Sequence, residues 1–220
     1  IKYPLIADSL LPDYAVLDAE LTRSVPPGVT ADTGIDVLTH AIEAYVCTEA
    51  NTFTDALAEK AVKLVDKYLL TAYREPDNLE ARQAMHNASC LAGAAFSNAG
   101  LGLCHSMAHA LGAQAHIAHG RANAILLPYV MSFNAGCETT LTPTAGRYAE
   151  LAALIGMGAS STRQSALNLI HMVRRLETQM KMPLSIKDAG ISAADFDAML
   201  DTLADAALAD SCTATNPRVP

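Results

Sequence analysis

The segment TADTGIDVLTHAIEAYVCT, residues 30–48, predicts a long helix with two distinct faces. Thr30 or Asp32 is suited to cap its N-terminus, and apolar side chains recur after them at helical spacing. The apolar stripe consists of Ile35, Leu38, Ile42 and Tyr45. Asp36 and His40 are four residues apart, so their side chains project from one face of the same helix. The segment therefore predicts a core-forming helix that also presents a polar pair.

The same periodicity continues along the chain and predicts an all-α fold, a helical bundle. Further helices are expected at about 52–73, 78–97, 103–114, 122–133, 142–156, 161–180 and 193–209. The inward side chains expected in the first of these are Ala56, Ala61, Val65 and Leu69. Pro128 lies inside an expected helix and predicts a kink. Only the beginning differs, because short apolar runs at 3–7 and 14–18 predict two strands.

Composition and charge argue against several classes of protein. The formal net charge of −8 opposes binding to nucleic acid, which depends on Lys and Arg neutralising phosphates. No apolar run reaches the roughly 18 residues of a membrane span, and the first residues do not resemble a signal peptide. The five cysteines include no CxxC pair, so free thiols in a reducing cytoplasm are expected. The missing initiator Met predicts a fragment or a processed chain.

Histidines are concentrated in one stretch of the sequence. Four of the seven fall within fifteen residues, namely His105, His109, His116 and His119. An isolated histidine among apolar residues is usually a satisfied core residue, and an Asp–His pair is often a plain hydrogen bond. Four imidazoles together each need partners for both nitrogens, and metal ligation is a common solution. Spacing favours His105 and His109 as ligands alongside Asp36 and His40, and leaves His119 open.

Other kinds of site have no motif in this sequence. There is no HExxH, so a metalloprotease helix is not supported, and there is no GxSxG elbow of a serine hydrolase. The glycines at 100, 102 and 112 form neither GxGxxG nor GxxxxGK. The chain therefore has no recognisable cradle for a dinucleotide or a triphosphate.

Longer motifs resemble those of the iron-containing (group III) alcohol dehydrogenases. The matching stretches are TGIDVLTHAIEAY (33–45), GLGLCHSMAHALG (100–112) and HGRANA (119–124), and LDAELT (17–22) is similar to the domain junction of that family. The resemblance includes the fourteen-residue spacing between His105 and His119 and covers essentially the whole chain. It implies the helical C-terminal domain of the iron-type alcohol dehydrogenase and dehydroquinate synthase-like fold.

The resemblance assigns roles to individual residues. It implies a single metal held by Asp36, His40, His105 and His119. His109 is then not a ligand but lies near nicotinamide and substrate as a candidate proton relay. Phe96 falls where the family places an aromatic ring beside the nicotinamide, so Phe96 and His109 are the expected cofactor contacts. His116 matches no ligand of the family and is expected near the ligands or at the surface.

The resemblance also implies an activity that needs more than this chain. The family interconverts a short primary alcohol and its aldehyde with NAD(H) and Fe(II), with Zn(II) in some members. Members of the family also have an N-terminal nucleotide-binding domain, which this sequence lacks. Residues 1–26 are expected to be the last strands of that domain and the junction to the next one. Residues 27–220 are expected to be the metal-binding domain, with its final helix cut short. The isolated chain is therefore expected to be inactive.

Several other expectations follow from this interpretation. The orphaned strand edges predict a homo-oligomer. The expected substrate is a small alcohol or aldehyde. The expected location is the cytoplasm, which includes a bacterial metabolic compartment of the ethanolamine- or propanediol-utilisation type. Two alternatives stay open: a glycerol dehydrogenase-like or dehydroquinate synthase-like member of the same fold, and a non-catalytic helical module for assembly or metal binding.

Overall fold

The computed structural model describes residues 7–220, which form eight α-helices and no β-strand. The helices are α1 (Pro27–Val46), α2 (Thr52–Arg74), α3 (Leu79–Ala99), α4 (Leu103–Ala115), α5 (His119–Ala135), α6 (Pro143–Leu154), α7 (Thr162–Gln179) and α8 (Ala193–Ala209). Three short 3₁₀-helices accompany them, η1 (Asp8–Leu10), η2 (Ala19–Thr22) and η3 (Ser211–Thr215). The predicted all-α class is confirmed, and α2 to α8 begin and end within three residues of the predicted positions, whereas α1 begins earlier than predicted.

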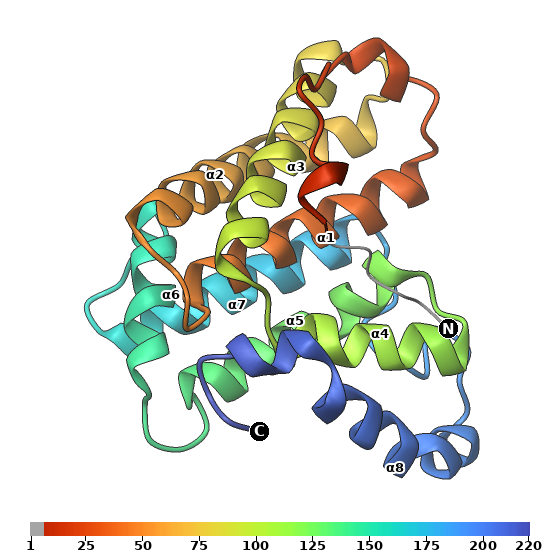
Figure 1. Cartoon of the computed structure of the whole chain (residues 1–220), viewed down its shortest axis with the longest axis vertical. Coiled ribbons are helices and arrows are strands. Elements are labelled where there is room, and N and C mark those ends of the chain that lie inside the picture. Colours follow the sequence, from red (N-terminus) through yellow and green to blue (C-terminus); the bar gives the residue numbers. More distant parts are fainter. Residues whose placement is uncertain (1–6) are drawn as a thin grey trace.

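Helix α1 is the central element of the bundle (Figure 1). It packs against α2, α3 and α5, so apolar residues are buried around most of its circumference. The predicted stripe is confirmed, because Ile35, Leu38 and Ile42 have no exposed surface and Tyr45 is 2% exposed. Each fully buried Leu or Ile stabilises the fold by roughly 2 kcal/mol. The polar pair thus lies on a helix whose other side chains are largely buried.

The start of α1 differs from the sequence prediction. The helix begins at Pro27 with Pro26 as its N-cap residue, and neither Thr30 nor Asp32 caps it. A proline in the first turn needs no hydrogen bond from its nitrogen and already has a helical φ, which explains the earlier start. Thr30 instead accepts a hydrogen bond from Nη1 of the buried Arg82 at 2.8 Å. In α2, Ala61, Val65 and Leu69 are buried as expected, but Ala56 is exposed.

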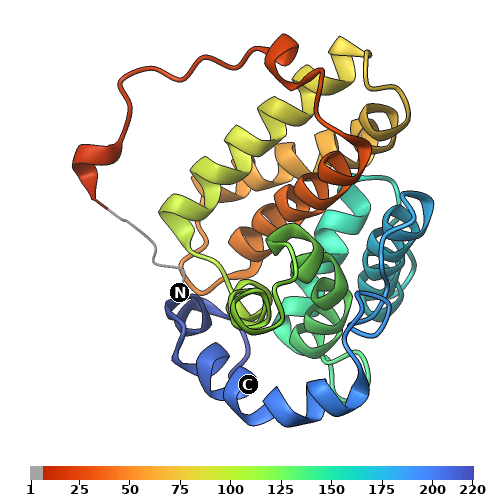
Figure 2. The same ribbon diagram turned by 90° about the vertical axis from the view of Figure 1, so that its right-hand side faces the viewer.

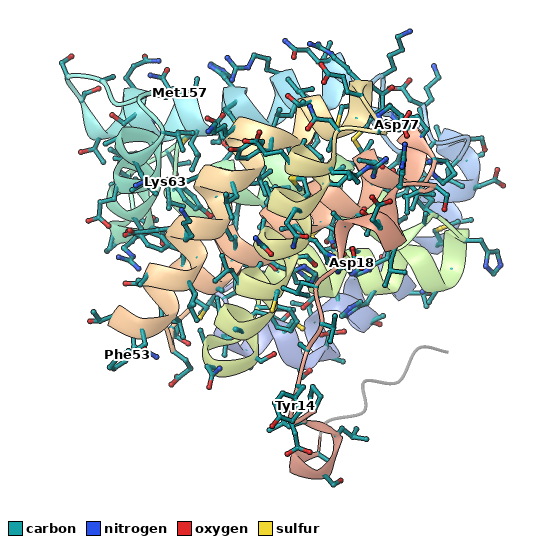
Figure 3. The ribbon with its side chains drawn as sticks, turned by 90° about the horizontal axis from the view of Figure 1, so that it is seen from above. Tyr14, Asp18, Phe53, Lys63, Asp77 and Met157 are labelled. Atoms are coloured by element: carbon teal, nitrogen blue, oxygen red, sulfur yellow. The ribbon has the colours of Figure 1, made fainter. Side chains whose placement is uncertain are left out.

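The strand predicted at 14–18 is wrong. The segment around Tyr14 runs outside the helical body in an irregular conformation (Figures 2 and 3), and the chain returns to α3 at Leu17, whose carbonyl accepts a hydrogen bond from Gln83 at 3.1 Å. Tyr14 and Val16 are 90% and 83% exposed. A strand needs a neighbour for its backbone hydrogen bonds, and the described residues supply none. The strand predicted at 3–7 lies almost entirely outside the described residues. The expected homo-oligomer depended on open strand edges, so it stays an untested prediction.

The second half of the bundle is built on α4, α5 and α8. Helix α4 packs against both α5 and α8, and α6 packs against α7. Helix α5 continues past Pro128 to Ala135, so the proline does not end the helix. Among the described residues, no helix combines the length and the apolar character needed to cross a membrane. All five cysteines are free thiols.

The first turn of α5 approaches the backbone of α1 unusually closely at Gly120. A Cβ atom on this residue would lie 2.2 Å from the carbonyl oxygen of Asp32 and 3.3 Å from the Cβ of Asp36. Real Cβ atoms do not approach backbone atoms to 2.2 Å, so only glycine fits. This contact fixes the position of His119, at the start of α5, relative to Asp36.

We predict that Gly120→Ala separates α5 from α1 and lowers the free energy of unfolding by about 1–3 kcal/mol, because the added methyl group meets backbone that has no room to move. Chemical denaturation followed by circular dichroism measures the change. Gly146→Ala is the matched control, since no atom lies within 4 Å of a Cβ at that position in α6. It should raise stability by about 0.5–1 kcal/mol. Equal effects of the two substitutions would contradict the role assigned to Gly120.

Candidate metal centre

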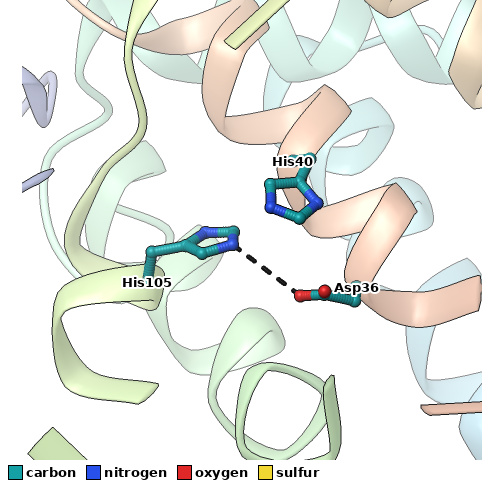
Figure 4. A group of neighbouring side chains, drawn as sticks. All are labelled: Asp36, His40 and His105. Carbon is teal, nitrogen blue, oxygen red and sulfur yellow. Dashed lines mark ion pairs between the residues drawn. The ribbon is translucent and has the colours of Figure 1, made fainter. Parts of the chain in front are cut away.

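Three predicted ligands meet between α1 and the first turn of α4. Asp36 and His40 come from α1 and His105 from α4, and one ligand atom of each lies within 4.8 Å of the others (Figure 4). His105 Nε2 is 3.7 Å from Asp36 Oδ1. Helical spacing alone aligned the first two residues, and the tertiary fold adds the third from the start of α4. The set contains nitrogen and oxygen donors only, which suits Fe(II), Zn(II) or Mn(II).

His119, the fourth predicted ligand, enters from the first turn of α5. Its Nε2 is 3.6 Å from Asp36 Oδ1, and its ring centroid is 5.3 Å from that of His105. Helix α5 therefore places His119 beside two members of the cluster. The approach at Gly120 makes this possible, because a larger residue there would move the helix away from α1.

The amide of Asn123 lies in the middle of the cluster. Its Nδ2 donates to Asp36 Oδ1 at 2.6 Å and lies 3.3 Å from Nε2 of both His105 and His119. Asn123 has no exposed surface. An amide NH₂ group carries two hydrogens, so it is not able to serve three acceptors fully. One carboxylate oxygen and two ring nitrogens thus share the two hydrogens of a single buried NH₂ group. An excess of electron pairs at one buried point fits a bound cation.

A buried carboxylate orients His105 from behind. Glu43 of α1 is 3% exposed, and its Oε2 is 2.6 Å from His105 Nδ1. Its Oε1 accepts a hydrogen bond from the backbone N–H of Cys104 at 2.7 Å. A carboxylate only accepts, so Nδ1 of His105 carries the hydrogen and Nε2 keeps its lone pair. That nitrogen faces Asp36, as ligation requires, and such outer carboxylates strengthen metal sites.

His40 is held between two rings. It stacks on Phe96 with ring centroids 4.6 Å apart, and its centroid is 4.4 Å from that of His105. Burial lowers the pKa of His40 well below its ordinary value, and the neighbouring His105 lowers it further. The imidazole is therefore neutral at physiological pH, which is the form that binds a metal. Phe96, predicted as a cofactor contact, lies directly against a candidate ligand.

His109 and His116 lie differently from the other histidines. The ring of His109 stacks on His119 at 5.3 Å, and its Nδ1 is 2.9 Å from Oδ2 of Asp210, at the end of α8. His116 is exposed and ends α4 in a left-handed conformation with φ 55°. The structure thus brings His109 to the edge of the cluster and leaves His116 at the surface.

The buried Cys104 does not add a sulfur ligand to the cluster. Burial raises the pKa of its thiol, so the thiol stays protonated and offers no thiolate.

Sequence reasoning missed Glu43, Asn123 and Asp210. Glu43 follows His40 by three residues, the spacing of neighbours on a helix face, which was the available signal. Asn123 likewise follows His119 by four residues inside a quoted motif. Asp210 had no local signal, because it is 101 residues from its partner His109. These three side chains contact the predicted site residues directly.

Comparison with known proteins shows the family of this chain. The model of the Fe-containing alcohol dehydrogenase family, C-terminal, matches residues 30–220. The chain belongs to this family, as its all-helical C-terminal domain. It is similar to the 1-propanol dehydrogenase PduQ of Salmonella typhimurium, with 50% identity over 220 residues. It is also similar to the NADPH-dependent butanol dehydrogenase of Clostridium saccharobutylicum, with 47% identity over 218 residues.

The chain spans little more than half the length of these relatives. It aligns over 99% of its own residues but covers 58% of the propanol and 54% of the butanol dehydrogenase. The crystal structure of sulfoacetaldehyde reductase from Bifidobacterium kashiwanohense in complex with NAD⁺ superposes with a TM-score of 0.82 at 31% identity. That superposition covers 98% of this chain and 53% of the reductase. The fold of the helical domain is therefore shown.

We predict that Glu43→Gln weakens divalent metal binding by about 10–100-fold. The glutamine keeps an oxygen for the Cys104 N–H but presents an NH₂ group to His105 Nδ1, which moves the hydrogen of that ring to Nε2. Calorimetric titration of the metal-free chain with Zn²⁺ measures the affinity. Glu59→Gln is the control, since that carboxylate lies 3.4 Å from the Tyr45 hydroxyl, away from the cluster. Unchanged zinc affinity in Glu43→Gln would contradict the orienting role.

Proposed function

We propose that this chain is the metal-binding catalytic domain of a nicotinamide-dependent alcohol dehydrogenase that interconverts a short primary alcohol and its aldehyde. The observation that carries the proposal is the meeting of Asp36, His40 and His105 in a chain of the iron-containing alcohol dehydrogenase family. The names of the relatives, a propanol and a butanol dehydrogenase, support a short primary alcohol as the substrate.

Four residues would hold the metal: Asp36, His40, His105 and His119. The family name supports Fe(II), and the nitrogen and oxygen donors also suit Zn(II). A bound divalent ion acts as a Lewis acid that favours ionisation of an alcohol and polarises a carbonyl group. The chain contributes orientation: Glu43 fixes the tautomer of His105, and Phe96 fixes the ring plane of His40 by stacking.

Two further residues would act on substrate and cofactor. His109 lies at the edge of the cluster, stacked on His119, and we assign it the exchange of the substrate proton. Phe96 is half-buried with one ring face against His40, and we assign the rest of its surface to the nicotinamide. Both assignments need the cofactor to approach the helical domain from outside.

The nicotinamide cofactor itself is proposed to come with a second domain. NAD⁺ is bound in the reductase structure, and the butanol dehydrogenase relative is named for NADPH, so both forms of the cofactor have support. Residues 1–26 would then be the junction to a nucleotide-binding domain and residues 27–220 the catalytic domain. A cytoplasmic location, which includes a bacterial metabolic compartment, remains part of the proposal.

His119→Ala tests the ligand set. We expect divalent metal affinity to fall by at least about 100-fold, because loss of a direct ligand should exceed the effect of losing an outer partner. Titration with Co²⁺, followed by its visible absorption, reports both affinity and coordination. His116→Ala is the matched control, since that histidine is exposed at the end of α4. Wild-type affinity and an unchanged spectrum in His119→Ala would remove His119 from the ligand set.

The activity is tested by supplying the nucleotide-binding domain. The chain alone, loaded with Fe²⁺ under argon, should show no NAD-dependent ethanol oxidation, because the cofactor lacks its main binding surface. The longer enzyme should oxidise ethanol and propanol faster than glycerol, and ferrous iron or zinc should be required. Turnover by the isolated chain would contradict the proposal that a second domain binds the nicotinamide cofactor. A preference for glycerol would favour the glycerol dehydrogenase alternative, and no turnover at all would favour a non-catalytic module.

A further inference from the structure

His109 has a carboxylate partner that the sequence motifs do not include. Asp210 ends α8 and starts η3, and its Oδ2 is 2.9 Å from His109 Nδ1. The two residues are 101 positions apart and meet because α8 and η3 both pack against α4. Within residues 7–220, the other ring nitrogen, Nε2, makes no hydrogen bond with the protein. The histidine therefore has one nitrogen anchored and one available.

Asp210 is itself held in place on its other side. Its Oδ1 accepts a hydrogen bond from the backbone N–H of Cys212 at 2.9 Å. Ser106 Oγ is 3.4 Å from the same oxygen, and the Thr213 hydroxyl lies 2.8 Å from Ser106 Oγ. Burial alone would raise the pKa of Asp210, but hydrogen bonds from Cys212 and His109 outweigh burial and lower it. Asp210 is therefore an ionised, immobilised acceptor.

A second metal site is a weaker interpretation of the same side chains. His109, Asp210 and Cys212 each place one donor atom within 4.8 Å of the others. A thiol binds metals as the thiolate, and burial together with Asp210 raises the pKa of Cys212 to about 12. Asp210 Oδ2 is already at hydrogen-bond distance from His109 Nδ1. The group is better explained as a hydrogen-bonded pair.

We propose that Asp210 is a positioning residue that fixes His109 as the tautomer with hydrogen on Nδ1, which leaves Nε2 as the proton acceptor for the substrate. An ionised carboxylate only accepts hydrogen bonds, so Nδ1 must donate and the lone pair remains on Nε2. This inference rests on the proposed function of His109. In alcohol oxidation Nε2 takes the hydroxyl proton, and a bound nicotinamide would supply the acceptor for the hydride with its electron pair, which leaves the aldehyde. In aldehyde reduction Nε2 returns the proton.

Asp210 also caps η3, so the experiment must separate capping from positioning. Asp210→Asn does this, because asparagine is an equally good cap. The asparagine oxygen still accepts the hydrogen bond from the Cys212 N–H. The asparagine NH₂ group then faces His109 Nδ1 and forces the ring hydrogen of His109 onto Nε2. Asp18→Asn is the matched control. Asp18 caps η2 in the same way, through Glu20 N at 2.9 Å, without a histidine partner.

The tautomer is measured directly on this chain. Long-range ¹H–¹⁵N correlation spectra at about pH 8, above the ordinary histidine pKa of about 6.5, distinguish a protonated from an unprotonated ring nitrogen. His109→Gln identifies the signals. We expect the hydrogen of His109 on Nδ1 in the wild type and in Asp18→Asn, and on Nε2 in Asp210→Asn. The same tautomer in wild type and Asp210→Asn overturns the proposal.

The consequence is measured on the longer enzyme that includes the nucleotide-binding domain. Asp210→Asn should lower kcat by about 100-fold or more and change KM by no more than about threefold. Asp18→Asn should match the wild type, and Asp210→Asn combined with His109→Gln should be no slower than His109→Gln alone. A switched tautomer with unchanged kcat overturns the proton-transfer role. A wild type without dehydrogenase activity contradicts the proposed function instead, and the spectra still decide whether Asp210 positions His109.

Discussion

The close approach of α5 to α1 at Gly120 is the contact on which the candidate metal centre depends. It brings His119 to 3.6 Å from Asp36, and the ion pair between Arg121 and Asp32 at 3.0 Å joins the same two helices. A bulkier residue at this point would separate the elements that supply the donors. Helix α4 is then fixed against α1 by the buried contact between Glu43 and His105. The geometry of the site is thus set by one steric and one electrostatic constraint.

Helix α4 carries two histidines one turn apart, and each has a carboxylate at Nδ1. Glu43 stands behind the fully buried His105, and Asp210 behind the half-exposed His109. In both pairs the carboxylate holds the ring hydrogen on Nδ1 and leaves the lone pair on Nε2, but the two free nitrogens have different roles. In the dry interior the free Nε2 faces Asp36, where it is suited to a cation. At the more accessible edge it can exchange protons with a bound molecule. Burial, and not the type of residue, separates the two roles.

The helices were predictable because each follows its own local periodicity, with cap residues such as Asn51 and Ser161 at the starts. Residues 14–18 were not, since strand formation depends on a partner that local sequence does not reveal. Asp36 and His40 could be paired from their spacing on one helix. Spacing left His109 and His119 as alternatives, because that decision depends on how α4 and α5 cross. Asp210 was out of reach of local reasoning, as it joins α4 only through tertiary packing.

The position of Asn123 has a consequence for how the centre is filled. Its amide already gathers Asp36, His105 and His119 around one electropositive group. A cation at this point would therefore compete with the Asn123 amide for the same electron pairs. The helices around the site bury an extensive apolar core of their own, whereas small metallo-domains depend on their ion to fold.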